Sequence, residues 1–401
     1  MKLAAPLTAL FACCSAPLAL AQEALFDFSG VTALARGAVL GTNVEDPVPG
    51  FEMLLMKNGR VVYHRAFGVW TLGRPANADS STKTISGAVL IALMDERPQA
   101  FNLDTRLSQY IPQFSGLKST ITIRQAFSHT AGFGFSGAEG DATLTLQQAA
   151  LDIANDPLRN LPGTVFDYGG TSMHAAGAVA ELAAGESWNS LFQRKLAGPL
   201  GWTTTRFVLT SPTNPRIAGG CESTAAEFAR MMEMLRTGGL HNGRRVLSER
   251  GVETLLTRQT PVGIPIEGSP LPGVSDYGVG IWLDQRDAEG NLIGAIAGGA
   301  RGFCSWIDLD DGVTGVVATD LTRFNNIEQW QYLVRAEVER AVRNPLPCPA
   351  DFNRDGFADF FDYDDYVLAF ETGDPSADVN LDDFIDFFDY DLFVEAFEFG
   401  C

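Results

Sequence analysis

Apolar residues recur in this sequence with two spacings, one typical of strands and one typical of helices. Apolar runs at 51–56 and 60–64 flank Lys57-Asn58-Gly59, a pattern that indicates a β-hairpin. Strands at both ends of the main region, with helices between them, predict an α+β fold. We expect an α/β/α sandwich in which the two ends close an antiparallel sheet, with flanking helices and an inserted helical region. Helical spacing occurs at 85–96, 172–184, 224–235 and 326–342, and strand-like runs return at 277–282, 293–297, 303–309 and 315–319.

The first residues have the pattern of a secretory signal peptide, which we place at 1–21. Lys2 is followed by a mostly apolar stretch, and Ala19-Leu20-Ala21 is a small-x-small cleavage site. A lipoprotein with its attachment box at 10–13, or a buried N-terminal helix, are the alternatives. We therefore expect a secreted, periplasmic or cell-surface protein. No later apolar run approaches the ~20 residues that a transmembrane helix needs.

A proline-rich stretch at 344–350 divides the chain, because proline stops helices and favours extended linkers. We expect one large domain at 22–343 and a small module at 351–401. Sixteen acidic residues and one basic residue between Cys348 and Cys401 account for −15 of the net charge of −20. This charge argues against nucleic acid as a partner, since phosphate binding needs a basic surface.

Ser80 and Lys83 stand three residues apart at the start of a predicted helix, a spacing that places both side chains on one face. A serine hydroxyl becomes a good nucleophile when a neighbouring group takes its proton, and a lysine amine in a dry pocket can do so. The alternative is a capped helix with Lys83 in solvent.

Two further segments carry candidate chemistry. Tyr168 lies on a turn before a predicted helix and can relay a proton, although it can also simply pack a loop. The glycine-rich stretch 297–303 lets its backbone approach an acyl group, so that its N–H groups can bind an oxyanion. A strand bulge is the alternative there.

In this order, the three segments resemble the serine β-lactamase, penicillin-binding protein and carboxylesterase superfamily, and most of all its class C-like branch. Further similar phrases are found at 128–133, 199–202 and 219–225, and the resemblance covers about 51–341. It implies a β-lactamase/DD-peptidase-like fold. It also implies that Ser80 is acylated, that Lys83 is the general base and Tyr168 its acid/base partner, and that backbone N–H groups of Ser80 and Ala300 hold the oxyanion.

The sequence departs from that family at two positions. Gly170 stands where the second motif usually ends in Asn, and Ala297 stands where the third motif usually begins with Lys or His. Because those side chains hold the substrate amide or carboxylate, we rank esterase-like hydrolysis of a small ester or peptide-like substrate first. A β-lactamase or D-Ala-D-Ala peptidase is the second reading, and a non-catalytic surface protein with a degenerate cleft is the third. The candidate substrate-binding residues are Gly170, Gly298, Gly299 and Arg301, the last as a replacement positive charge.

Two stretches that begin at Asp351 and Asp378 repeat with a period of 27 residues, which indicates two copies of one unit. Each copy offers side-chain oxygens at positions 1, 3, 5, 9 and 12 and a backbone carbonyl at position 7, the spacing of an EF-hand calcium loop. We expect two Ca²⁺ ions here as cofactors and none for catalysis. The expected ligands are Asp351, Asn353, Asp355, Phe357, Asp359 and Asp362, then Asp378, Asn380, Asp382, Phe384, Asp386 and Asp389.

Two such loops, each followed by a short helix, resemble a type I dockerin, a small all-α module, in the variant found on exported planctomycete proteins. The resemblance implies docking or sorting at a cell surface. Cys348 and Cys401 bracket the module, and we expect them to pair. That leaves Cys221 with Cys304, either as a second disulfide or as two unpaired buried thiols.

Overall fold

The structure is a computed structural model that describes residues 25–271, 273–321, 327–380 and 384–399. The predicted signal peptide at 1–21 lies outside these residues, as do Asp382 and Cys401. The chain divides into two compact units. The larger holds 32–59 and 64–336, and the smaller holds 60–63 and the chain from 337 onward, together with the residues before 32. Within the described ranges, no helix has both the length and the apolarity to cross a membrane.

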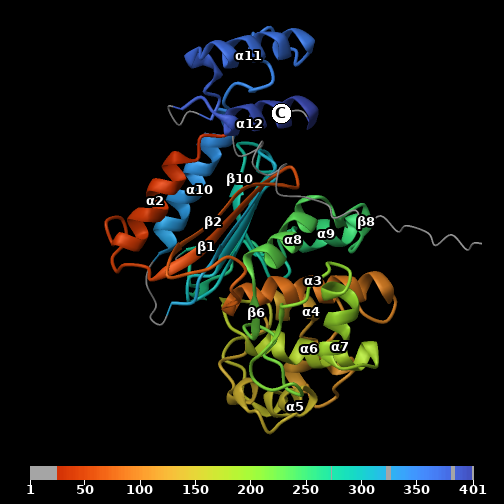
Figure 1. The fold of residues 1–401 in the computed structure, drawn as a ribbon. Helices are drawn as coiled ribbons and strands as arrows, with labels where there is room; N and C mark the ends of the chain where they lie inside the picture. The colour runs from red at the N-terminus through yellow and green to blue at the C-terminus, as the bar shows by residue number, and fades with distance from the viewer. Residues whose placement is uncertain (1–24, 272, 322–326, 381–383, 400–401) are drawn as a thin grey trace, which may run out of the picture. The chain divides into compact units, whose positions relative to one another are not determined.

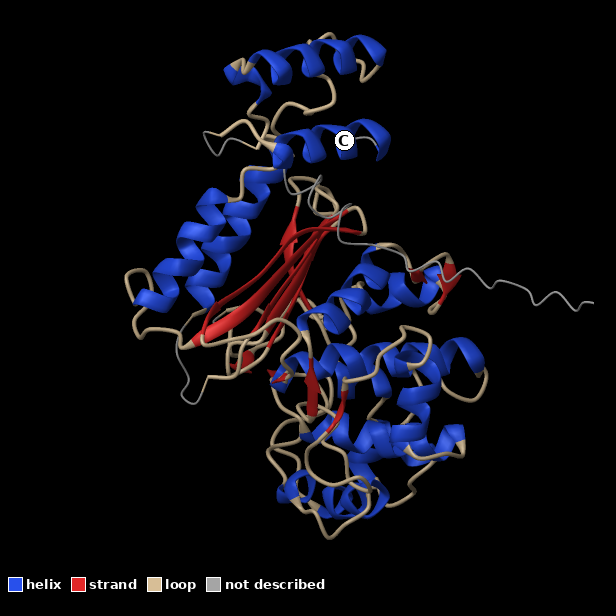
Figure 2. Ribbon diagram, viewed as in Figure 1, coloured by secondary structure: helices blue, strands red, loops and turns tan. Residues whose placement is uncertain are grey.

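The main sheet has six strands in the order β10-β11-β12-β13-β1-β2 (Figures 1 and 2). Strand β1 pairs antiparallel with β13, with Leu54 opposite Val316, so the N-terminal hairpin joins the last strands of the main region. The predicted antiparallel sheet that the two ends close is therefore confirmed. Its strands are β1 (Gly50–Lys57), β2 (Arg60–Gly68), β10 (Trp282–Arg286), β11 (Leu292–Gly298), β12 (Cys304–Asp308) and β13 (Val313–Ala318).

Helices cover both faces of this sheet (Figure 1). On one face, Trp330 of α10 (Glu328–Arg343) packs edge-on against Phe51, and its indole N–H donates to the Leu34 carbonyl of α2 (Ser29–Leu40). On the other face, Glu233 of α8 (Ala225–Arg236) accepts a 2.7 Å hydrogen bond from Thr314. Strands β1, β12 and β13 are buried along most of their length, because the side chains that alternate along them face a helical layer on each side.

The inserted helical region is built around α3 (Thr82–Glu96), in which every residue from Thr82 to Leu93 is buried. It adds the helices α4 (Ile123–Phe127), α5 (Leu146–Asn155), α6 (Thr171–Ala184), α7 (Trp188–Phe192) and α9 (Glu249–Leu255). Single turns of helix lie at Asp79–Ser81, Leu107–Gln109, Gly116–Thr120, Gly137–Gly140 and Gln193–Ala197. Short strands lie at Ala76–Asn77 (β3), Phe166–Asp167 (β4), Arg206–Phe207 (β5), Cys221–Ser223 (β6), Leu240–His241 (β7), Arg244–Arg245 (β8) and Ile266–Gly268 (β9).

The predicted strand at 277–282 is wrong for most of its length, because β10 begins only at Trp282. The segment before it is a turn in which Gly280 adopts φ +81°. A Cβ atom on Gly280 would lie 2.2 Å from the Lys83 carbonyl oxygen. Close backbone contact with α3 therefore requires glycine here, and it takes the segment out of the sheet.

The alternative of a Cys221–Cys304 disulfide is also wrong, since both are buried free thiols. Cys221 begins β6 of a separate three-stranded sheet, whereas Cys304 begins β12 of the main sheet. Burial raises the pKa of Cys304 to about 12 and that of Cys221 well above its ordinary value. Both thiols therefore behave as small apolar core residues. The pairing of Cys348 with Cys401 stays a prediction.

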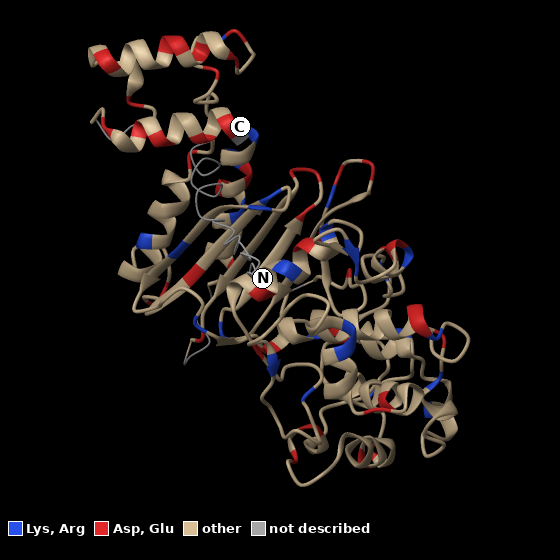
Figure 3. Cartoon of the chain, turned by 45° about the vertical axis from the view of Figure 1, so that its right-hand side comes forward, with Lys and Arg blue, Asp and Glu red and all other residues tan. Residues whose placement is uncertain are grey.

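The C-terminal segment contains α11 (Phe360–Thr372) and α12 (Phe387–Phe399), joined through a short helix at Pro375–Ala377. Equivalent residues of the two repeats pack on each other: Tyr366 stacks on Phe393 at 3.9 Å, and the Tyr363 and Tyr390 hydroxyls lie 3.3 Å apart. The repeat in sequence therefore becomes a paired helical core. Acidic side chains follow both helices (Figure 3).

The first predicted calcium loop is held by its own side chains. Asp351 accepts from the Gly356 N–H, and Asp362 accepts from the N–H groups of Asn353 and Asp359. Gly356 has φ +92°, which suits the sharp turn at loop position 6. Among the residues that the structure describes, no three His, Cys, Asp or Glu side chains form a group that could hold a metal. Calcium binding therefore stays a prediction.

The buried carboxylate of Glu227 on α8 is expected to stabilise the larger unit. Burial alone would raise its pKa, but N–H groups of Thr203, Thr204 and Thr205 donate to its carboxylate and hold the pKa below its ordinary value of 4.5. This stabilisation is present above the unfolded pKa and is lost as pH falls through the lower folded value. We expect Glu227→Gln to lower the free energy of unfolding at pH 7 by ~1–3 kcal/mol.

Urea unfolding at pH 7 and at pH 3.5 measures this effect, with the exposed Glu253→Gln as the control. The difference between wild type and Glu227→Gln should shrink at the lower pH, because the carboxylate of the unfolded wild-type chain takes up a proton there. An equal difference at both pH values would contradict the proposed role of the carboxylate charge.

Candidate active site

Ser80 lies in the single helical turn Asp79–Ser81, directly before α3. Two contacts fix this turn. The Ser81 hydroxyl donates to the Ala297 carbonyl at 3.1 Å, and Asp79, at φ +45°, accepts hydrogen bonds from Arg301. The nucleophile candidate is therefore held between the start of the buried helix and the end of strand β11.

Lys83 is 4% exposed, which excludes the alternative of a solvated lysine. Its Nζ atom donates to Ser80 Oγ at 3.0 Å and to the Ala218 carbonyl at 2.8 Å. The same Nζ lies 4.6 Å from the centre of the Tyr168 ring. The three-residue spacing on a helix thus places an amine next to a serine hydroxyl in a nearly dry environment, which is the arrangement that a lysine general base needs.

Tyr168 follows the short strand β4, and aromatic rings hold it in place. Its ring stacks on Trp282 at 5.4 Å and lies 4.3 Å from the ring of His129. Tyr277 also contacts this cluster, and burial, with Tyr168 beside it, raises the pKa of Tyr277 well above its ordinary value. Tyr168 is thus a fixed side chain that lines the same pocket as Ser80.

His129 has a structural role beside Tyr168. Its Nδ1 accepts a 3.3 Å hydrogen bond from the Gly169 N–H, and its backbone carbonyl accepts from the Asp167 N–H at 2.9 Å. Burial, and next the charge of Lys83, hold the pKa of His129 well below its ordinary value. A neutral imidazole therefore supports the segment that carries Tyr168.

The glycine-rich stretch approaches the nucleophile as predicted. A Cβ atom on Gly299 would lie 2.5 Å from the Ala78 carbonyl oxygen, so only glycine lets this strand end lie against the segment before Ser80. A Cβ atom on Gly298 would meet nothing within 4 Å, because this residue faces open space. Both glycines and Ala300 line one pocket with Ser80.

Arg301 does not provide a free positive charge for substrate. Its Nε and Nη2 atoms donate to the two Asp79 carboxylate oxygens at 2.9 and 2.7 Å, and its Nη1 lies 2.9 Å from Asp320. Two carboxylates therefore neutralise the guanidinium. The prediction that Arg301 binds substrate is therefore corrected. Arg301 instead positions Asp79, the residue before Ser80.

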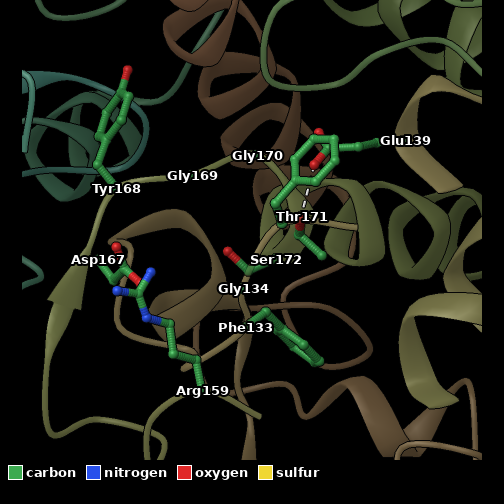
Figure 4. A pocket seen from close by; sticks show the side chains of 11 residues that line it. Phe133, Gly134, Glu139, Arg159, Asp167, Tyr168, Gly169, Gly170, Thr171 and Ser172 are labelled. Carbon is green, nitrogen blue, oxygen red and sulfur yellow. Dashed lines mark hydrogen bonds and ion pairs between the residues drawn. The ribbon is translucent and has the colours of Figure 1, made fainter. Parts of the chain in front are cut away.

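Glu139 is a residue that the sequence did not single out. It is 3% exposed, and its Oε1 accepts a 2.8 Å hydrogen bond from Thr171 (Figure 4). A Cβ atom on Gly170 would lie 2.5 Å from Glu139 Oε2. The carboxylate therefore occupies the space beside Gly170. The sequence feature that could have pointed to Glu139 was Gly170, because a glycine in place of a larger residue implies that another group fills the space of the missing side chain.

The pocket around Ser80 has a volume of about 470 Å³. Much of its wall is apolar, from Leu271, Trp282, Ile296 and Ile327. A small apolar group attached to a reacting carbonyl would fit this lining. A second pocket of about 220 Å³, lined by Glu139 and Gly170, shares Tyr168 with the first (Figure 4).

The family model described as Beta-lactamase matches residues 37–337. The chain belongs to the beta-lactamase family. The match covers Ser80, Lys83, Tyr168 and the glycine-rich stretch, and all of these except Lys83 contribute to the lining of one pocket. Beta-lactamase-family membership therefore confirms the predicted superfamily at the level of a serine hydrolase fold.

Individual relatives agree with this family. The chain is 26% identical over 191 residues to Protein flp of Staphylococcus aureus strain N315, covering 44% of this chain and 38% of that protein. The chain thus spans well under half of this curated relative. A putative beta-lactamase from Bacteroides dorei DSM 17855 superposes with a TM-score of 0.71 at 26% identity, over 79% of this chain and 99% of that one. A family VIII carboxylesterase shares the fold with a TM-score of 0.61 at 19% identity, over 78% and 97% of the two chains.

Proposed function

We propose that this beta-lactamase-family protein is an exported serine hydrolase that cleaves carboxylic esters through an acyl intermediate on Ser80. The observation that carries the proposal is the 3.0 Å contact between Lys83 Nζ and Ser80 Oγ, made by a lysine that is almost fully buried. In this position Lys83 Nζ is within reach of the proton that Ser80 Oγ must lose when it attacks a carbonyl.

In the proposed reaction, Ser80 Oγ attacks the ester carbonyl while its proton passes to Lys83 Nζ. Backbone N–H groups of Ser80 and Ala300 stabilise the negative charge that develops on the carbonyl oxygen. Collapse of the tetrahedral intermediate breaks the bond to the leaving alcohol, which takes a proton from Lys83 through Tyr168. Water, deprotonated by the same pair, then attacks the acyl-Ser80 ester and releases the acid, restoring the serine hydroxyl.

Three features favour esters over β-lactams or D-Ala-D-Ala peptides. Ala297 is a buried alanine of β11 and offers no cation. Gly170 offers no side chain, and Arg301 is already bound by Asp79 and Asp320. The groups that would hold a substrate carboxylate or amide are therefore missing, whereas an ester needs only the nucleophile, the base and the oxyanion donors.

Removing the nucleophile or its base tests the mechanism. We expect Ser80→Ala to abolish labelling by a fluorophosphonate probe, because the probe reacts with the serine oxygen. We expect Lys83→Ala to lower kcat/KM for p-nitrophenyl butyrate ~10²–10⁴-fold, the usual loss on removing a general base. The melting temperature of each variant serves as the folding control. Undiminished labelling of a folded Ser80→Ala protein would mean that another residue is the nucleophile.

Substrate preference separates the esterase reading from the β-lactamase reading. We expect kcat/KM for p-nitrophenyl butyrate to exceed that for nitrocefin, since the described residues that line the pocket around Ser80 include no Lys or Arg to bind the β-lactam carboxylate. Steady-state assays of both substrates with one enzyme preparation measure the ratio. A higher value for nitrocefin would favour the β-lactamase reading, and turnover of neither substrate, without probe labelling, would favour a non-catalytic cleft.

We also propose that the C-terminal segment binds calcium and attaches the hydrolase to a partner at the cell surface. Its loop oxygens are the hard ligands that Ca²⁺ prefers. The segment also keeps six phenylalanines exposed at positions equivalent in the two repeats, each at least 66% exposed. Exposed apolar side chains of this number indicate contact with a partner rather than packing. They are Phe357, Phe360, Phe361, Phe384, Phe387 and Phe388.

Calorimetric titration of the full chain, stripped of metal by EDTA, tests calcium binding. We expect two ions per chain and a calcium-dependent rise in the melting temperature of the segment, because bound cations relieve repulsion among its carboxylates. The double variant Asp351→Ala/Asp378→Ala should lose both effects and keep ester hydrolysis. Absence of calcium uptake at millimolar concentrations would contradict the proposal.

A further inference from the structure

Glu139 and Gly170 form a complementary pair beside Ala218, one of the residues that hold Lys83. The Glu139 carboxylate lies where a side chain at position 170 would begin, with Oε2 2.5 Å from the ideal Cβ position. A second atom, Ala218 Cβ, lies 3.2 Å from the same position. Ala218 is also the residue whose carbonyl accepts from Lys83. The absence of a side chain at 170 thus creates space that a carboxylate from a distant segment fills, close to the residues that hold the catalytic lysine.

The Glu139 carboxylate is firmly held on one oxygen only. Thr171 donates to Oε1, and the same Thr171 oxygen accepts from the Ser136 N–H, which fixes this side of the group. Oε2 has a distant partner: Arg216 Nε lies 4.0 Å away on a side chain that is 42% exposed. An ion pair at that distance and exposure contributes little, so Oε2 keeps capacity to accept a hydrogen bond.

The pocket beside Glu139 is suited to a cation. Its other acidic group, Asp167, is already paired with Arg159 at 3.3 Å. Among the described residues, Glu139 has no hydrogen-bonded basic partner, although the charges of Arg216 and Lys83 act on it from farther away. Phe133 and Phe135 also line the pocket, and aromatic faces attract ammonium groups. Burial raises the pKa of Glu139, which shows how poorly its surroundings replace water as a partner for the charge.

Tyr168 connects this pocket with the nucleophile, because it lines the pocket that holds Glu139 and also the pocket that holds Ser80. The two pockets therefore meet at one side chain, Tyr168. We propose that Glu139 is a specificity-determining residue that binds a primary ammonium group of the substrate, so that the preferred substrates are amine-bearing esters. This inference rests on the proposed ester hydrolysis at Ser80.

Two pairs of isosteric esters test the proposal and locate the amine. The p-nitrophenyl esters of alanine and isobutyric acid differ by an ammonium in place of a methyl group on the acyl side. The esters 3-aminopropyl butyrate and butyl butyrate make the same comparison on the alcohol side. We expect the amine-bearing member of at least one pair to have the higher kcat/KM, by roughly 10- to 100-fold, the range of a hydrogen bond to a charged group.

Glu139→Gln keeps the shape of the side chain and removes its charge, and we expect it to abolish that preference. Gly170→Ala should weaken the preference as well, because its methyl group displaces Oε2. In the Glu139→Ala background the same Gly170→Ala change should have no further effect on the ratio, since the displaced group is absent. Glu181→Gln is the matched control: this second buried glutamate, on α6, accepts from the N–H of Trp188 on α7, and its change should leave the ratio at the wild-type value.

The outcomes separate this inference from the proposed function. Loss of preference in Glu139→Gln, with measurable ester turnover, supports it. Equal turnover of both members of each pair by wild type, or a Glu139→Gln variant that loses rate equally on both members, overturns it and leaves Glu139 as a structural residue. If no ester is hydrolysed and no probe labels Ser80, the proposed hydrolase function itself fails.

Discussion

The burial of the Lys83 amine is the constraint on which the rest of the site depends. Placing an ammonium-forming group in a nearly dry interior is costly unless every hydrogen of the amine finds a partner. Here Ser80 and the Ala218 carbonyl accept from it, and the Tyr168 ring lies over it. Ala218 and Tyr168 come from two distant parts of the chain, so the fold must bring both segments to the turn that carries Ser80 and Lys83 before the amine has these partners.

Backbone packing at glycines achieves this convergence. Gly280 lies against the Lys83 carbonyl, Gly87 of α3 lies against the Val279 carbonyl, and Gly299 lies against the Ala78 carbonyl. In each case a Cβ atom would fall 2.1 to 2.5 Å from a backbone oxygen, which no side-chain movement could relieve. The turn that carries Ser80 and the helix α3 that carries Lys83 are thus in direct main-chain contact with the segments around them, and this rigidity holds the two side chains in register.

Electrostatic balance around the site then limits its chemistry. Arg301 belongs to the glycine-rich stretch, and its guanidinium is paired with the carboxylates of Asp79 and Asp320. Glu139, far from any motif, brings a carboxylate to the space beside Gly170. Because the Arg301 guanidinium is already paired and Glu139 adds a buried carboxylate, the site is poorly suited to anionic substrates. This is consistent with the preference for neutral or amine-bearing esters that we propose.

The sequence by itself determined the features that depend on local spacing. The separation of Ser80 and Lys83 on a helix, the glycines that approach the nucleophile, and the paired repeats of the C-terminal helices all follow from residues close together in the chain. Three features were decided only by the tertiary structure. Asp79 neutralises Arg301 from 222 residues away, and Glu139 meets Gly170. Cys221 and Cys304 lie in different sheets. These depend on long-range packing, and a single sequence carries periodicity and spacing but no record of which distant side chain fills which space.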